Sequence, residues 1–147
     1  TLNTASARTG GTATLQDGVM RLGNASALGT AAVPLQLNLG TLDLSSNTTV
    51  NAYNTTVGGD VTIMSNRATA GAGITHVLGT LSMGANTLVI IRGDSSTSGV
   101  SAVQFGNFTM TGAPVLSAGT ANLVMAGTAS GAFRGLPEIF GRCLPGW

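Results

Sequence analysis

The sequence predicts an all-β protein, a right-handed parallel β-helix (β-solenoid) of about seven coils with an irregular C-terminal tail. Three observations lead to this fold class: apolar and polar residues alternate in short runs, Gly and Asn separate the runs, and a ten-residue phrase recurs. Alternation is the period of a strand with one buried face, and Gly and Asn accept the positive φ of sharp corners. No long window has a 3.6-residue period, so little helix is expected.

The alternating runs identify the expected strands. In each run the apolar residues should point into a thin core, and the residues between them should point outward. The runs are Met20/Leu22, Leu35/Leu37/Leu39, Leu42/Leu44, Val61/Ile63, Leu81/Met83, Leu88/Ile90, Val103/Phe105, Phe108/Met110 and Leu123/Met125.

The recurring phrase favours a solenoid over a sandwich or barrel. LGTLDLSSNT at 39–48 returns as LGTLSMGANT at 78–87, and a weaker copy, AGTANLVMAG, spans 118–127. Similar residues recur in a solenoid because every coil meets the same neighbours. With coils of roughly 20 residues, the first two copies should lie two coils apart. Leu42/Leu44 and Leu81/Met83 would then face inward, and Asn47 and Asn86 would occupy matching corners.

Composition limits the partners. Charged residues make up 7% of the chain, there is no Lys, and the formal net charge is +1. Without a basic patch, nucleic acid is not an expected partner, and without eighteen consecutive apolar residues no membrane-spanning segment is expected. The single Cys143 cannot form an internal disulfide. Because the chain begins with Thr1 and has no apolar signal segment, we expect a processed product or a piece of something longer.

The chain divides into three parts. Residues 1–11 are polar and are expected to be an exposed lead-in segment, and residues 12–130 are the expected β-solenoid repeats. Residues 131–147 differ in composition from the rest, and they include the only Glu, Cys and Trp of the chain. This C-terminal tail is expected to be a cap on the last coil, a loosely packed extension or an inter-subunit contact, because an uncovered last coil exposes unpaired backbone groups.

Two long runs resemble a known family. VMRLGNASALGTAAVPLQLNLGTLDLSSNTTV at 19–50 resembles the autotransporter-associated β-strand repeat of bacterial surface and secreted proteins, and SNRATAGAGITHVLGTLSMGANTLVI at 65–90 resembles its continuation. The likeness covers roughly residues 10–128. The chain keeps only TGGT, at 9–12, of a TYTGGTT-like phrase, and the tail has no counterpart. The resemblance implies a passenger-type parallel β-helix in an extracellular stalk, adhesin or fibre, without catalytic residues.

Catalytic chemistry has few candidates. His76 is the only His, so a Ser-His-Asp triad would have to use it with Asp43, Asp60 or Asp94, and a surface or turn His is the favoured interpretation. A β-helix carbohydrate-active enzyme, with Asp43, Asp60 and an Arg on one face, is the less favoured alternative. One His, one Cys and scattered carboxylates predict no metal site, and we expect no cofactor and no enzyme.

The tripeptide Arg92, Gly93 and Asp94 is the one ligand-binding candidate. Many adhesion ligands present this sequence to receptors, and here it follows the apolar run LVII and precedes a Ser/Thr-rich loop. Short motifs often arise by chance, and a Gly turn between two solubilising charges explains this one as well.

The predicted function is structural. We expect a secreted, extracellular or cell-surface unit of a bacterial stalk or filament, whose partner is itself, stacked head to tail, or adjacent repeats of a longer chain. The first coil should then be open. The alternative is an adhesin or binding module that uses a solenoid face for a host surface or a polysaccharide.

Overall fold

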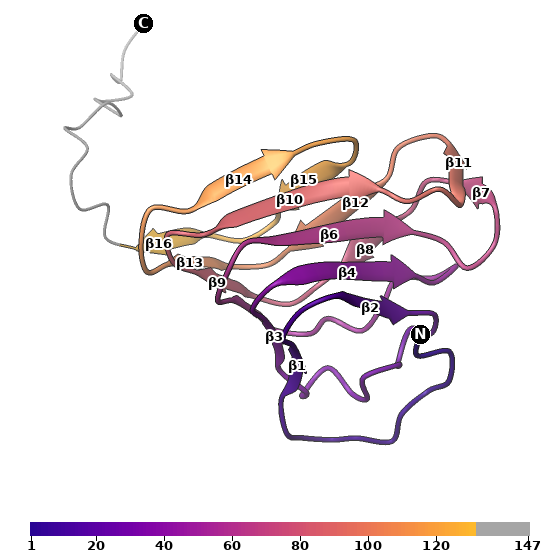
Figure 1. Cartoon of the computed structure of the whole chain (residues 1–147), viewed down its shortest axis with the longest axis horizontal. Coiled ribbons are helices and arrows are strands. Elements are labelled where there is room, and N and C mark those ends of the chain that lie inside the picture. The colour runs from indigo at the N-terminus through magenta and orange to yellow at the C-terminus, as the bar shows by residue number, and fades with distance from the viewer. Residues whose placement is uncertain (132–147) are drawn as a thin grey trace, which may run out of the picture.

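The computed structural model describes residues 1–131. These residues form sixteen short strands and no helix, which confirms the all-β prediction. The strands pair in parallel and form four sheets, named A to D here (Figure 1). Sheet A contains β2 (Val19–Leu22), β4 (Gly40–Ser45), β6 (Val61–Asn66), β10 (Thr87–Arg92) and β14 (Val115–Ala118). Sheet B contains β1 (Ala13–Leu15), β3 (Leu35–Leu37), β5 (Thr55–Val57), β9 (Leu81–Met83), β13 (Phe108–Met110) and β16 (Ala129–Gly131).

The two smaller sheets begin only in the middle of the chain. Sheet C pairs β7 (Gly71–Ala72) with β11 (Ser96–Ser98), and sheet D contains β8 (Thr75–Val77), β12 (Ala102–Phe105) and β15 (Asn122–Met125). Within each sheet the strands stack in chain order, as the colour gradient of Figure 1 shows for sheet A. This stacking is consistent with a solenoid. The tallest stack among residues 1–131, sheet B, has six strands, fewer than the seven coils predicted.

The layers of the stack have unequal lengths; a layer is the chain between one strand of a sheet and the next strand of that sheet. In sheet A, Met20 pairs with Leu42, Leu42 with Ile63, Ile63 with Ile90, and Ile90 with Ala118. These partners are 22, 21, 27 and 28 residues apart. The layers lengthen where β7, β8, β11 and β12 are added.

The prediction that the first two copies of the recurring phrase lie two coils apart is wrong, because the layers have unequal lengths. Its copies lie in three different sheets: the first forms β4 of sheet A, the second contains β9 of sheet B, and the third contains β15 of sheet D. Asn47 and Asn86 therefore do not share a corner. The Asn47 amide contacts Thr69, whereas Asn86 Nδ2 donates to the carbonyl oxygen of Val57 at 3.3 Å.

Each copy of the phrase has Gly-Thr as its second and third residues, and this pair forms a corner next to a strand in each of the three sheets. The Gly lies against the preceding layer, and in the first two copies, as at Gly29–Thr30, the following Thr nitrogen donates a hydrogen bond to that layer. Thr41 N donates to Gly18 O at 2.8 Å, and Thr30 N donates to Arg8 O at 2.9 Å. Only Gly permits so close an approach of two backbones. The phrase thus marks a corner followed by a strand, and not one place in a repeating coil.

The core contains many of the inward residues that alternation predicted, and it also contains buried residues outside those runs, such as Leu28, Val33, Tyr53 and Leu78. Leu42, Leu44, Ile63, Leu88, Ile90, Leu81, Met83, Val103 and Phe105 are all buried. Leu39 is an exception: it is 49% exposed, because it precedes the corner at Gly40 and the alternation does not continue through that corner. The outward positions of sheet B, in contrast, form a polar column of Thr14, Gln36, Thr56, Ser82, Thr109 and Ser130.

The first layer is partly covered, contrary to the expected open coil. Leu2 forms an isolated parallel bridge with Leu22, donating to Arg21 O and accepting from Gly23 N, each at 2.8 Å. The inward residues Leu15 and Leu22 are buried as a result. The lead-in segment is otherwise mostly exposed, as predicted.

The last described layer is open. Leu116 of β14 is in register with the buried Leu88, but it is 36% exposed. Leu123 and Met125 of β15 are in register with Val103 and Phe105, and they too are only partly buried. Of the predicted tail, 131–147, only Gly131 belongs to the described residues, and the predicted cap or inter-subunit contact falls on residues outside them.

Candidate functional site

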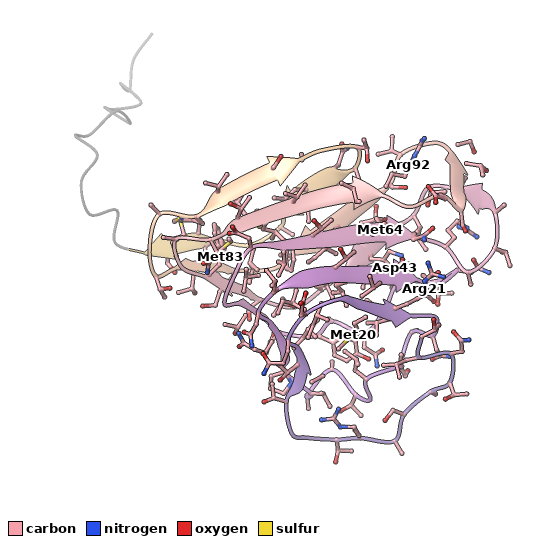
Figure 2. All side chains as sticks on the ribbon, in the orientation of Figure 1. Met20, Arg21, Asp43, Met64, Met83 and Arg92 are labelled. Carbon is pink, nitrogen blue, oxygen red and sulfur yellow. The ribbon has the colours of Figure 1, made fainter. Side chains whose placement is uncertain are left out.

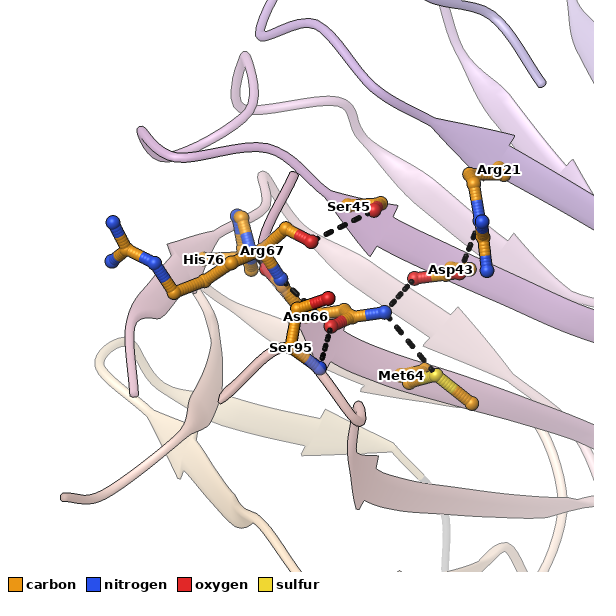
Figure 3. Close-up of polar contacts among 8 residues, drawn as sticks. All are labelled: Arg21, Asp43, Ser45, Met64, Asn66, Arg67, His76 and Ser95. Atoms are coloured by element: carbon orange, nitrogen blue, oxygen red, sulfur yellow. Dashed lines mark hydrogen bonds and ion pairs between the residues drawn. The ribbon is translucent and has the colours of Figure 1, made fainter. Parts of the chain in front are cut away.

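Two neighbouring strands of sheet A place an ion pair on its outer surface. Arg21 of β2 and Asp43 of β4 are cross-strand partners, and Arg21 Nε lies 2.6 Å from Asp43 Oδ2 (Figures 2 and 3). The Arg21 side chain is 49% exposed, whereas that of Asp43 is 2% exposed. A carboxylate this buried is stable only with partners that replace water.

Asn66, at the end of β6, supplies the second partner of Asp43 and connects three segments. Its Nδ2 donates to Asp43 Oδ1 at 3.2 Å. Its Oδ1 accepts hydrogen bonds from Arg67 N at 2.8 Å and from Ser95 N at 3.1 Å (Figure 3). The amide therefore joins β4, its own corner and the loop before β11. Both oxygens of Asp43 are occupied, which leaves this carboxylate poorly suited to act as a general base.

His76 of β8 lies inside the protein beside the same corner, which contradicts the expected surface or turn position. Its Nε2 is 2.8 Å from the carbonyl oxygen of Asn66, and an Nε2–H can donate to that oxygen. Burial lowers the pKa of His76 below its ordinary value of 6.5, while the Asn66 carbonyl and the charge of Asp43 oppose this shift in part. Ser45 Oγ closes the corner by donating to Arg67 O at 3.0 Å.

The hypothetical triad partners of His76 are dispersed. Asp43 shares Asn66 with His76 but bonds to the amide instead of the imidazole. Asp60 lies at the other end of sheet A, before β6, where its Oδ1 accepts from Thr87 N at 2.7 Å. Asp94 is exposed in the loop after β10. The arrangement can fasten three layers together, and it presents no aligned nucleophile, base and orienting acid.

The adhesion tripeptide lies where the chain leaves β10. Arg92 and Asp94 are exposed, and Gly93 between them is buried. Gly93 N donates to Ser65 O at 2.9 Å, and a Cβ at this position would overlap the Asn66 side chain. Close packing on Asn66 thus accounts for the Gly, while the two charged side chains remain accessible to a partner.

A shallow groove of about 320 Å³ runs along the outer surface of sheet A at the strand starts. Asp17 and Asp60 line it together with the hydroxyl-bearing Thr41 and Thr62 and the aliphatic Val89. No group of three or more His, Cys, Asp or Glu among residues 1–131 is placed to hold a metal ion. The same residues include no apolar helix of membrane-spanning length.

Stacked Asn–Gly pairs are the structural feature that the sequence interpretation missed. Five corners place a Gly directly over the side chain of an Asn in the preceding layer: Asn3–Gly23, Asn38–Gly58, Asn54–Gly79, Asn66–Gly93 and Asn107–Gly127. In two of them the next residue donates to the same amide, Thr80 N to Asn54 Oδ1 at 3.0 Å and Thr128 N to Asn107 Oδ1 at 3.1 Å. Asn followed by Gly at one layer length is the sequence signal of these corners.

Comparison of the chain with protein families, with curated proteins and with solved structures finds no match.

Proposed function

We propose that this protein is a non-catalytic structural unit of a secreted bacterial surface stalk or extracellular filament. In this proposal the layers close into a right-handed parallel β-helix, because parallel crossover connections are almost always right-handed. The stacking of parallel strands in chain order supports it, as does the resemblance of residues 19–50 to the autotransporter-associated repeat. The task of such a unit is mechanical: backbone hydrogen bonds run along the stack and a thin aliphatic core fills it.

The observation that carries the proposal is the open last layer. Leu116, Leu123 and Met125 continue the columns of buried core residues and are covered by nothing among residues 1–131. Among residues 1–131 no strand pairs with the outer edges of β14, β15 and β16, and such edges attract another strand. A second copy of the chain, or adjacent repeats of a longer one, would continue both the hydrogen bonds and the core.

Electron microscopy and light scattering of the purified chain over a concentration series test the proposal. We expect rod-like particles whose length grows with concentration. Leu116→Lys, which places a charge at the open end, should shorten them, whereas Thr56→Lys, at the exposed outward position of β5 in the middle of sheet B, should not. Particles of one size at every concentration, unaffected by Leu116→Lys, would refute self-stacking.

An adhesin is the second candidate, and the groove on sheet A supports it. Hydroxyl groups and carboxylates can form hydrogen bonds with the hydroxyls of a neutral polysaccharide, and the groove offers both. A glycan array with the wild type and Thr62→Val tests the groove, and a cell-binding assay with Asp94→Glu tests the tripeptide. Unchanged binding in Asp94→Glu would exclude only the tripeptide. An absence of binding in both assays would exclude the adhesin.

A further inference from the structure

The corner between β1 and β2 brings a carboxyl group against the next backbone nitrogen. Asp17 and Gly18 are both exposed, and Gly18 N donates to Asp17 Oδ1 at 2.6 Å. Gly18 has φ of 79°, and a Cβ built on it would meet nothing within 4 Å. The nitrogen therefore lies beside the side-chain carboxyl, with Gly40 packed over the backbone on one side and open space on the side where a Gly18 side chain would project.

We propose that Asp17–Gly18 is a site of spontaneous isoaspartate formation. Gly18 N attacks Cγ of the protonated Asp17 carboxyl, a C–N bond forms, the amide proton passes to solvent, and the carboxyl hydroxyl takes up a proton from solvent and leaves as water. The resulting succinimide then takes up one water molecule. Addition at Cγ restores Asp17, whereas addition at the main-chain carbonyl breaks the original peptide bond and leaves the chain connected through Cβ. Water is the only co-reactant, and the product is an isomer of the original chain.

The other aspartates of the described chain lack this arrangement. Asp94 is equally exposed, but the nitrogen that follows it, Ser95 N, donates to Asn66 Oδ1 at 3.1 Å and is held away from the carboxyl. Asp43 is buried against Arg21, and Asp60 precedes the β-branched Val61, which hinders attack. Holding the reacting atoms together is a large part of the rate of such intramolecular reactions. Asp17 is the aspartate that the fold presents in a reactive arrangement.

Isoaspartate formation at Asp17 would alter the corner just before β2, the first strand of sheet A. Isomerisation adds one methylene to the main chain between β1 and β2, both of which are in fixed register with the next layer. Gly18 O accepts a hydrogen bond from Thr41 N at 2.8 Å, and Gly40 lies directly over the Gly18 backbone. The longer corner displaces both contacts. The inference is independent of the proposed structural role, because it depends only on this corner.

Tryptic peptides separate Asp17 and Asp94 from each other and from the other aspartates, since cleavage occurs only after Arg. Residues 9–21 contain Asp17 alone, residues 22–67 contain Asp43 and Asp60, and residues 93–134 contain Asp94. The folded chain is aged at 37 °C in oxygen-18 water, digested, and assayed with an isoaspartyl methyltransferase and by mass spectrometry. We expect at least about tenfold more isoaspartate and label in peptide 9–21 than in peptide 93–134.

Two variants and one solvent condition sharpen the test. Asp17→Glu should abolish the signal, because a six-membered imide forms much more slowly. Asp17→Asn should convert faster through the same succinimide, with release of ammonia. In urea the difference between the two peptides should shrink, because only the folded corner holds the two groups together. Equal isoaspartate in peptides 9–21 and 93–134 of the folded chain, or a signal that survives Asp17→Glu, would overturn the proposal.

Discussion

Asn66 is held by more segments of the chain than any other residue discussed above. Its amide bonds to Asp43 and to the backbone of Arg67 and Ser95, its carbonyl oxygen faces His76, and Gly93 packs on its side chain. A buried amide with all these partners is fixed in one orientation, and the loss of any one partner leaves a polar group without compensation.

Gly93→Ala should therefore destabilise the protein. The added Cβ overlaps Asn66, which its hydrogen bonds prevent from moving aside, so the free energy of unfolding should fall by about 1–3 kcal/mol. Urea denaturation followed by circular dichroism measures the change. Gly10→Ala is the matched control: a Cβ there meets nothing within 4 Å, and its effect should stay within about 0.5 kcal/mol. Equal effects of the two substitutions would contradict the close Asn66–Gly93 contact.

His76 should make stability depend on pH in mildly acid solution. Burial lowers its pKa in the folded state below 6.5, so the unfolded chain binds a proton more readily. The free energy of unfolding should consequently fall as the pH falls below 6.5, and level off only below the folded-state pKa. Denaturation at a series of pH values measures this slope. His76→Gln, which keeps a donor for Asn66 O and does not titrate, should have a smaller slope; an identical slope would show that His76 is not the source of the pH dependence.

At the residue scale, the sequence identifies the charged and titratable residues but not the groups that they contact in the fold. His76 was expected at the surface, because nothing near it in the sequence reveals that Asn66, ten residues earlier, turns its carbonyl toward the imidazole. The Asn–Gly pairs could have been found, since Asn38–Gly58 and Asn107–Gly127 share a 20-residue spacing. Asn66–Gly93 could not, because the layer between them is lengthened by strands that have no regular period.

At the scale of strands, alternation predicted nine of the inward runs because the core is one residue deep and every second side chain must fill it. Alternation failed where an inward position is filled by a small or polar residue. The inward residues of β1 and β5 include Ala13 and Thr55, and β7 and β11 consist of Gly, Ala, Ser and Thr, so sheet C could not be anticipated. β12 and β15 were predicted as strands, but the alternation does not reveal that they form sheet D. The sheet to which a strand belongs also depends on the length of the layer before it, and the sequence of a single strand does not reveal that length.

The inward residues of a middle strand and of the last strand should differ in their contribution to stability. Leu44 of β4 is fully buried between neighbouring layers, so Leu44→Ala should cost about 2–5 kcal/mol. Leu116 of β14 occupies an inward position without a layer above it, so Leu116→Ala should cost about 1 kcal/mol or less. Chemical denaturation at a concentration too low for self-association measures both. Equal costs would mean that the last layer is covered in solution.

For the whole molecule, the stack should open from its last layer. Layers contact only their neighbours, so stability falls toward an uncovered end. We expect native-state hydrogen exchange to be slowest in β4 and β6, intermediate in β2, and fastest in β14, β15 and β16. Leu2→Pro, which removes the N–H that donates to Arg21 O, should speed exchange in β2 and should leave β10 unchanged. Uniform protection along the stack would indicate a single cooperative unit instead.

The unequal layers have a further consequence for how such a chain can vary. The layer from Ile63 to Ile90 has six residues more than the layer from Leu42 to Ile63, yet the three residues remain stacked in one column. The additional residues are accommodated at a corner, where the chain forms β7 and β8 of sheets C and D. The following strands keep their register. Insertions at the corners of sheets C and D should thus be tolerated, while a single residue added inside β6 would turn every following side chain of that strand to the opposite face.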